Sequence, residues 1–223
     1  MTLTEREAGQ ACAQTAEGAE PAQPAHAGAA SPVPHKHAVM VEWIVIVVVA
    51  LVAALLIKTF AVQAFFIPST SMVPTLQVGD RVLVNKLSYD FHSVHQGDIV
   101  VFRRPPNDSS LGINDLIKRV VAGPGQTVYV ANCAVYVDGR QMAQPYIPGW
   151  QDPSSPYCTT WPTSGCAGPC LPNPYTVPQG YYFVMGDNRR DSYDSRYWGP
   201  LPASYIVGRA FVRMWPLGRL GFL

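Results

Sequence analysis

The sequence is poor in charge. Only 14% of its 223 residues are charged, and 16 Lys and Arg against 15 Asp and Glu leave a formal net charge of +1. Residues 1–37 hold two basic against four acidic side chains, and residues 58–223 hold 14 against 10. Nucleic-acid-binding surfaces need a concentrated basic excess, so this balance argues against a nucleic-acid partner.

Several patterns that bind cofactors or metals are also missing. The chain has no glycine-rich phosphate loop and no dinucleotide-binding fingerprint. A zinc site needs clustered ligands, and Cys166 with Cys170 supplies one half of such a pattern without a second pair. His92 and His95 lie three residues apart in an expected loop, where histidines are usually solvated. We therefore expect no metal and no cofactor.

The first 37 residues lack any apolar repeat with the period of a helix or a strand. Ten of them are Ala and four are Pro, and most of the others are small or polar. Such a segment buries too little apolar surface to offset the entropy lost on ordering it. We expect a disordered tail over residues 1–37.

Residues 38–57 have the opposite character. Nineteen of these twenty residues are apolar, and the run from Trp43 to Ile57 is uninterrupted. As a helix the stretch would be roughly 30 Å long, which matches the hydrocarbon core of a bilayer. Trp43 near one end and Lys58 with Phe60 at the other suit the two membrane interfaces. The sequence predicts one transmembrane helix over residues 38–58.

Two other interpretations of this apolar stretch stay open. A buried core helix is one, although core helices are rarely apolar on every side over such a length. A cleavable secretory signal is the other, because residues 62–64 resemble a small-residue cleavage site at which self-processing would remove the anchor. A charged region of 42 residues with little positive charge is unusual for such a signal, which favours a retained anchor. Charge does not orient the span, since Arg6 and Lys36 precede it and Lys58 follows it.

From residue 65 onward the sequence is typical of β structure. Short segments rich in Val, Ile, Tyr and Phe alternate with turn sequences such as Gly-Asp and Asp-Gly. No amphipathic helix of useful length separates them, which argues against a parallel sheet. We predict a mainly β domain over residues 59–223, built on an antiparallel, folded-over sheet. Its expected strands are residues 81–87, 98–104, 116–122, 127–131, 134–137, 181–185 and 206–215.

Residues 143–178 interrupt this pattern. Nine of the 36 positions are Pro, and Cys158, Cys166 and Cys170 fall among them. We interpret the segment as a loop-rich insertion on the β domain with a structural or accessory role.

A serine near the apolar stretch is the first candidate for chemistry. A Ser-His-Asp protease needs a histidine from the folded domain, and only His92 and His95 follow the apolar stretch, neither with an obvious serine partner. Ser71 instead lies in residues 68–76, between two prolines that restrict the backbone. Alone this signal is weak, because Ser, Thr and Pro also make up ordinary loops.

Lys118 is the second candidate. Side chains alternate along a strand, so Leu116, Lys118 and Val120 share one face. On an inward, apolar face the lysine would be desolvated, which lowers its pKa and lets a neutral amine take a serine proton. A surface lysine on an edge strand is the alternative, and the strand alone does not exclude it.

The third candidate is the polar segment 186–199, which follows a predicted apolar strand. It gathers Asp, Asn, Arg and Ser in one turn. Such a cluster suits a hydrogen-bonded platform beside an active site, and a plain polar loop is the alternative.

Together these three segments resemble the type I signal peptidases, the membrane-bound Ser-Lys enzymes that remove signal peptides from exported proteins. Four family boxes occur in order, at residues 68–76, 79–86, 118–123 and 186–199. The resemblance covers roughly residues 60–140 and 180–215. The apolar stretch, which ends about fourteen residues before Ser71, also fits the family layout.

The resemblance implies a role for each matching residue. Ser71 would attack the scissile carbonyl, and Lys118 would accept its proton and later donate to the leaving amine. The Ser69 hydroxyl and the Ser71 backbone N–H would form an oxyanion hole. Ser192 would orient the lysine amine.

Two further sets of residues follow from the resemblance. Residues that would support the site from behind are Asp187, Asp194 and Arg196. Residues that would line shallow pockets for small side chains at positions −1 and −3 are Phe65, Ile67, Met72 and Ile117. Arg190 and Asp191 fall in a variable stretch, and the insertion is not part of the family core.

The resemblance also implies a location. The family's catalytic domain faces the extracytoplasmic side of the cell membrane, which would leave residues 1–37 in the cytoplasm. We expect a single-pass, monomeric enzyme whose partners are the lipid bilayer and preprotein signal peptides, with no nucleic acid.

Two other function classes compete with this expectation. A self-cleaving repressor also uses a Ser-Lys β domain, but it needs a DNA-binding helix-turn-helix that residues 1–37 do not supply. A catalytically dead, membrane-anchored binding module is the second, and intact Ser71, Lys118 and Ser192 argue against it.

Four cysteines follow the apolar stretch: Cys133, Cys158, Cys166 and Cys170. Outside the cytoplasm they could form disulfides, whereas Cys12 in the tail would stay reduced. Three pairings are possible and the sequence does not choose among them. We expect at least one bridge within or onto the insertion; free or metal-binding thiols are the alternative.

Overall fold

The computed structural model describes residues 36–56, 61–108, 112 and 114–223. The chain divides into two compact units, residues 1–45 and 46–223. Except for its last two residues, the tail predicted over residues 1–37 lies outside the described part of the chain.

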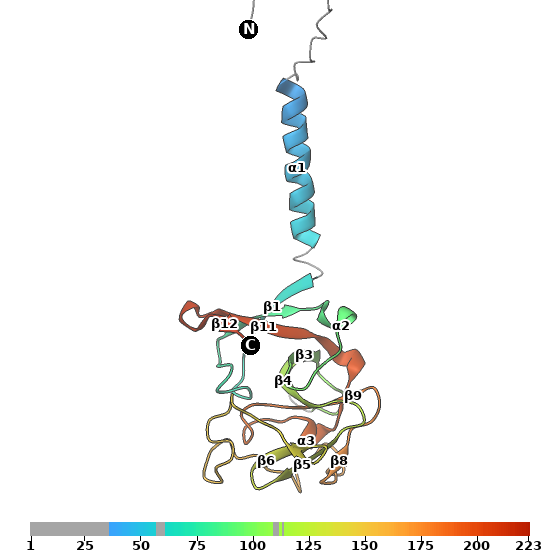
Figure 1. The fold of residues 1–223 in the computed structure, drawn as a ribbon, viewed down its shortest axis with the longest axis vertical. Helices are drawn as coiled ribbons and strands as arrows, with labels where there is room; N and C mark the ends of the chain where they lie inside the picture. Colours follow the sequence, from blue (N-terminus) through green and yellow to red (C-terminus); the bar gives the residue numbers. More distant parts are fainter. Residues whose placement is uncertain (1–35, 57–60, 109–111, 113) are drawn as a thin grey trace, which may run out of the picture. The chain divides into compact units, whose positions relative to one another are not determined.

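Helix α1 runs from Lys36 to Leu56 (Figure 1). It begins two residues before the predicted span, and its side chains from Val39 to Leu55 are exposed. Among the residues that the structure describes, no helix combines the length and the hydropathy expected of a membrane span.

Beyond α1 the described residues form two antiparallel sheets (Figure 1). In the larger sheet the order is β1-β2-β11-β3-β4-β9-β10, with β12 beside β11. Its strands are β1 (Val62–Phe66), β2 (Arg81–Asn85), β3 (Ile99–Arg103), β4 (Asp115–Ala122), β9 (Tyr181–Met185), β10 (Leu201–Pro202), β11 (Ile206–Trp215) and β12 (Gly221–Phe222). The smaller sheet has the order β7 (Arg140–Gln141), β6 (Ala134–Val137), β5 (Thr127–Ala131) and β8 (Tyr175–Thr176).

Short helical turns connect some of these strands. They are α2 (Ser88–Phe91), α3 (Ser195–Trp198), η2 (Ala203–Tyr205) and η3 (Leu217–Arg219). The smaller sheet lies at the far end of this unit from β1, β11 and β12 (Figure 1). The prediction of a mainly β, antiparallel domain is confirmed.

The core that positions the serine segment includes residues of β2, β3, β4 and β11. Ile67, Met72 and Leu76 are each at most 1% exposed and pack against Val82 of β2 and Ile117 of β4. Burying an aliphatic side chain of this size stabilises a fold by roughly 1.5–3 kcal/mol. The apolar residues on both sides of Ser71 therefore fix its loop to the sheet.

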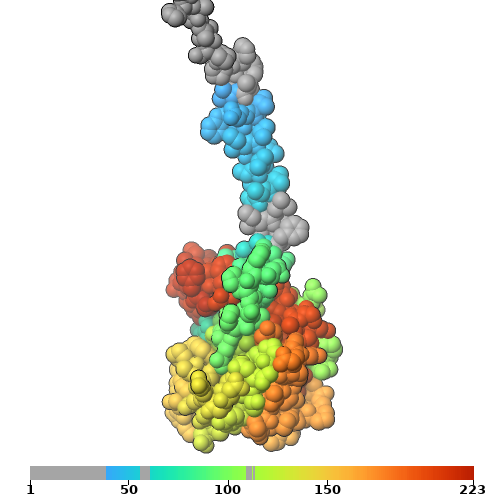
Figure 2. All heavy atoms as spheres, turned by 45° about the vertical axis from the view of Figure 1, so that its right-hand side comes forward, coloured from blue at the N-terminus to red at the C-terminus, as the bar shows by residue number. Residues whose placement is uncertain are grey.

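The insertion is held by two disulfides, and in Figure 2 it lies on the molecular surface in yellow to orange. Cys133, next to the β5–β6 turn, pairs with Cys158, and Cys166 pairs with Cys170. The backbone N–H of Thr159 also donates to the Cys133 carbonyl. The predicted bridge onto the insertion is confirmed.

Candidate active site

Ser71 lies in a turn directly after β1. The Val73 N–H donates to the Thr70 carbonyl and the Leu76 N–H donates to the Met72 carbonyl, so the backbone around Ser71 winds tightly. Ser71 itself is 8% exposed. The turn presents its hydroxyl at the surface of the core without leaving it open to bulk water.

Lys118 lies on β4, opposite Val100 of β3. Its side chain is buried, and its Nζ donates a hydrogen bond of 2.6 Å to Ser71 Oγ. The two residues are 47 positions apart in the chain, so the sheet brings them together.

Burial changes the protonation of Lys118. The loss of hydration lowers the pKa of this amine from its ordinary 10.5 to about 8. The carboxylates of Asp194, Asp108 and Asp187 act in the opposite direction, and the charge of Arg196 adds to the lowering. None of these carboxylates forms an ion pair with the amine in the described structure, so desolvation decides the direction.

Ser69 lies next to Ser71 and lines the same small cavity as Lys118. Its Oγ is 3.3 Å from Ser71 Oγ, and the residue is half-buried. Three polar groups therefore converge here: two hydroxyls and one amine.

The segment 186–199 packs directly against the Ser71 turn. The Asn188 N–H donates to the Ser71 carbonyl, and Asn188 Nδ2 donates to the Thr70 carbonyl. A Cβ added to Gly186 would come within 2.4 Å of the Ser71 carbonyl oxygen and 2.3 Å of Ser192 Oγ. Only glycine allows this close approach without a backbone shift.

Asp187 ties the serine segment to β4. Its carboxylate accepts from Arg119 Nε at 2.9 Å and Nη2 at 2.7 Å, and from Thr75 Oγ1 at 2.6 Å. Asp187 is fully buried and Arg119 nearly so. A carboxylate with three such donors is a rigid junction, because each of its oxygens has a fixed partner.

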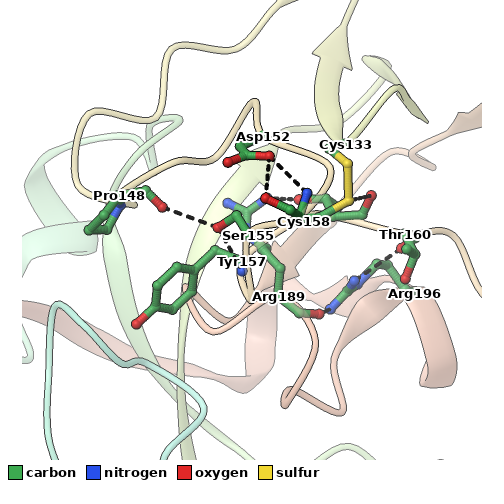
Figure 3. The surroundings of a disulfide bond; sticks show 11 residues. Cys133, Pro148, Asp152, Ser155, Tyr157, Cys158, Thr160, Arg189 and Arg196 are labelled. Carbon is green, nitrogen blue, oxygen red and sulfur yellow. Dashed lines mark hydrogen bonds between the residues drawn. A yellow bond between two sulfur atoms is a disulfide. The ribbon is translucent and has the colours of Figure 1, made fainter.

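Asp194 and Arg196 form a second buried junction. Arg196 donates from Nε and Nη2 to the two carboxylate oxygens at 2.8 and 2.9 Å, and the Gly186 N–H donates to the same carboxylate. Although burial raises the pKa of Asp194, the guanidinium and these hydrogen bonds outweigh it and hold that pKa below its usual value. Arg196 also donates to the carbonyls of Thr160 and Arg189, which links the insertion to this segment (Figure 3).

A small, mostly apolar groove includes the two hydroxyls and the amine among its walls. Besides Ser69, Ser71 and Lys118, its walls are Phe65, Phe66, Ile67, Pro68, Val101, Asp115, Leu116 and Ile117. Its cavity volume is ≈ 30 Å³. A larger cavity of ≈ 680 Å³ lies elsewhere, between residues 96–97 and β6–β7, and none of its walls belongs to this site.

A family model described as signal peptidase, peptidase S26, matches residues 40–215 of the chain. The chain belongs to this family. It is therefore a serine peptidase of the type I signal peptidase kind, as its resemblance predicted.

Three relatives illustrate how far the similarity extends. A signal peptidase I from Leptolyngbya laminosa is 39% identical over 206 residues, which cover 91% of each chain. A signal peptidase I from Mycobacterium tuberculosis is 36% identical, over 85% of this chain and 77% of that protein. Thylakoidal processing peptidase 1 from Arabidopsis thaliana is 37% identical, over 75% of this chain and 46% of that protein.

The structure brings most of the predicted site residues of the peptidase together, with two exceptions. Met72 is fully buried in the core and is not a wall of the groove. Ser192 lies beside Gly186 and Ser71, but its Oγ is buried without a hydrogen bond to Lys118 in the described structure.

His92 and His95 of the peptidase are not among the residues that surround Ser71. Both are exposed and border a different cavity together with Tyr89 and Arg209. Within the described residues, no cluster of three His, Cys, Asp or Glu side chains has the geometry of a metal site.

Sequence reasoning missed three residues that hold the peptidase's site together. Thr75 and Arg119 both bind Asp187, and Gly186 leaves the space that a Cβ would take from Ser192 Oγ and the Ser71 carbonyl oxygen. All three stand inside the family boxes, and Arg119 is next to Lys118. Alternation along β4 points Arg119 away from Lys118. The sequence does not tell which segment packs on that face, so the contact of Arg119 with the 186–199 segment could not be predicted.

Proposed function

We propose that this peptidase removes N-terminal signal peptides from exported preproteins with a Ser-Lys dyad. Ser71 is the nucleophile and Lys118 its general base. The 2.6 Å contact between Lys118 Nζ and Ser71 Oγ carries this proposal, together with burial that lowers the pKa of the amine to about 8. An amine with such a pKa is partly neutral near pH 7 and can accept the hydroxyl proton.

The chemistry proceeds in two halves. Ser71 Oγ attacks the scissile carbonyl while its proton moves to Lys118 Nζ, and the resulting ammonium gives that proton to the leaving amine. Water then attacks the acyl-enzyme, with Lys118 again as base, and Ser71 regains its proton. The Ser69 hydroxyl and the Ser71 backbone N–H stabilise the oxyanion in both halves, and the 3.3 Å contact between the two hydroxyls supports this role for Ser69.

The groove supports selection of small side chains. Its cavity volume of ≈ 30 Å³ leaves room only for small groups. Side chains at −1 and −3 would contact Phe65, Ile67 and Ile117 there, while Met72 supports the floor from the core. Larger side chains would have to displace well-packed core residues.

The remaining site residues act on the geometry. Asp187, Asp194 and Arg196 hold the 186–199 segment against the Ser71 turn through their buried junctions. Ser192 orients the Lys118 amine once a substrate closes the site, which its position beside Gly186 and Ser71 supports.

A membrane anchor completes the proposal. The apolar residues 38–57, most of them in α1 with exposed side chains, are suited to a bilayer. We propose that residues 38–58 hold the peptidase in the cell membrane with residues 1–37 in the cytoplasm and residues 59–223 outside. The two disulfides in residues 133–170 support that side, because disulfides persist in oxidising compartments.

Cleavage of a purified preprotein by the full-length chain in lipid vesicles tests this function. The expected product begins one residue after a small −1 side chain, as N-terminal sequencing of the mature protein would reveal. A chain that binds the preprotein but leaves it intact would be a binding module, and the proposal would fail.

A further inference from the structure

The groove of the proposed dyad also has a charged group among its walls. Besides Ser69, Ser71 and Lys118, the walls include Asp115, whose side chain is exposed. On β4 the apolar residues Leu116 and Ile117 separate Asp115 from Lys118. A peptide that runs along this strand from Lys118 would therefore pass apolar side chains and reach a negative charge.

The edge of β4 beside this groove is open among the described residues. β4 pairs with β3 over residues 115–119, but it pairs with β9 only from Arg119 onward. β1, the other wall, pairs with β2 alone. An extended peptide can add to such edges through main-chain hydrogen bonds, while its alternate side chains are selected by pockets.

Strand geometry assigns the substrate position that meets Asp115. Under the proposed function, the scissile bond lies at Ser71 and Lys118, and side chains −1 and −3 contact Ile117. In a peptide that runs parallel to β4, the residues before the scissile bond extend from Lys118 towards Asp115. Asp115 and Ile117 lie two residues apart and share one face of β4. Odd-numbered positions of the peptide share that face, and −5 is the next one beyond −3, at about 3.3 Å per residue.

The charges around Asp115 leave its carboxylate available. No hydrogen bond or ion pair to this side chain is formed by the described residues. Its cross-strand neighbour on β3 is Arg103, which is also exposed. Side chains directly opposite each other on antiparallel strands lie on the same face, so Arg103 weakens the field of Asp115 without cancelling it.

We propose that Asp115 is a specificity-determining residue that favours a basic and disfavours an acidic side chain at position −5 of the substrate. This inference rests on the proposed function. It adds a charge criterion on the amino side of the apolar pockets. Preproteins with Lys or Arg at −5 would be processed faster than otherwise identical ones with Asp or Glu.

Peptides that differ only at −5, with Lys, Gln or Glu there, test the proposal with the full-length chain. At low salt we expect kcat/KM to be about three- to tenfold higher for Lys than for Glu, which is the size of one exposed ion pair gained and one repulsion removed. Asp115→Asn should bring this Lys-to-Glu ratio close to one. Salt should reduce the ratio for the parent chain, because the pair is exposed.

Arg103→Gln is the matched variant, because it removes a positive charge beside Asp115 where Asp115→Asn removes a negative one. Removing this cation should raise the Lys-to-Glu ratio, whereas Asp138→Asn, at an exposed turn outside the groove, should leave it unchanged. An unaltered ratio in Asp115→Asn would overturn the inference, as would an Asp115-dependent preference at −4 in place of −5. If the parent chain cleaved none of the peptides, the proposed function would fail as well. If it cleaved the Lys and Glu peptides equally well, only this inference would be refuted.

Discussion

Two buried polar pairs lie close together in this peptidase and differ in what burial does to them. In one, Lys118 makes a single 2.6 Å contact with the neutral hydroxyl of Ser71. In the other, Arg196 meets the carboxylate of Asp194 through two hydrogen bonds of 2.8 and 2.9 Å. Both cations are at most 4% exposed.

Their protonation responds in opposite directions. Burial lowers the pKa of Lys118 to about 8, because the loss of hydration outweighs the opposing charges of Asp194, Asp108 and Asp187. Burial also acts to lower the pKa of Arg196, but the charge and hydrogen bonds of Asp194 outweigh it and raise that pKa instead. Arg189, another buried guanidinium with no ion pair in the described structure, follows Lys118, since burial lowers its pKa to about 10. Burial thus lowers the pKa of these two cations, whereas the paired carboxylate of Asp194 reverses the effect at Arg196.

Removing either member of the Ser71–Lys118 pair should have the largest effect on activity. Ser71→Ala and Lys118→Ala should each reduce preprotein cleavage by about 10⁶-fold, because a nucleophile and its base act as one unit. Circular dichroism and thermal melting should show that both variants still fold.

The histidine variants serve as the control for this pair. His92→Ala and His95→Ala should cleave like the parent chain, since both side chains are exposed and neither lines the groove at Ser71. Loss of activity in either one comparable to that of Ser71→Ala would disprove the Ser-Lys assignment.

Breaking the buried ion pair between Asp194 and Arg196 should instead lower the stability of the fold. Arg196→Ala leaves the carboxylate of Asp194 buried without its counter-ion, which we expect to lower the free energy of unfolding by about 3–5 kcal/mol. Denaturant titration of the full-length chain, followed by a signal from residues 46–223, measures this loss. Activity should fall in proportion to the folded fraction. If the variant unfolded like the parent and yet were inactive, Arg196 would belong to the reacting groups.

Ser69 tests whether the hydroxyl beside the Ser71–Lys118 pair stabilises the oxyanion. Ser69→Ala removes a hydroxyl that matters most once the oxyanion forms, so kcat should fall about 10²–10³-fold, or roughly 2.7–4 kcal/mol, with KM nearly unchanged. Steady-state kinetics separates the two constants. A raised KM at constant kcat would assign Ser69 to substrate binding.

The disulfide between Cys133 and Cys158, near the Asp194–Arg196 ion pair, should contribute less to stability than that ion pair. Thr160, which accepts from Arg196, follows Cys158 closely (Figure 3). Replacing Cys133 and Cys158 by Ser reopens a loop of 25 residues and should cost about 3 kcal/mol of stability. The Cys166 and Cys170 bridge spans only four residues and should cost less. Equal losses on thermal melting of the two double variants would contradict the loop-length argument.

The sequence predicted the strands that carry the sheet, and their pattern explains why. Segments such as 127–131 and 134–137 have the β-branched and aromatic residues that half-buried strands favour, and the structure has strands at those residues. Strand β1 (Val62–Phe66) was missed although it has five residues. The two-residue strands β7, β8, β10 and β12 were also missed, because two residues are too few to show alternation. β8 lies within the Pro-rich insertion, where local sequence favours loops.

The site was accessible to sequence reasoning only through the family resemblance. The proximity of Ser71 and Lys118 depends on sheet pairing between segments that are 47 positions apart. The roles of Thr75 and Arg119 at Asp187 depend on a junction of three separate segments, which composition cannot reveal. The disulfide pairing likewise required the fold, since four cysteines alone permit three connectivities.

The pH dependence of single-turnover cleavage tests the central claim most directly. If the neutral Lys118 amine is the base, the rate should rise about tenfold per pH unit below pH 7 and level off above its pKa of about 8. Replacing Lys118 by Cys and alkylating it to the less basic thia-lysine should move this rise to lower pH by the difference in basicity of the two amines. A rise that stayed at the same pH in the thia-lysine enzyme would contradict the account, because another group would then supply the base.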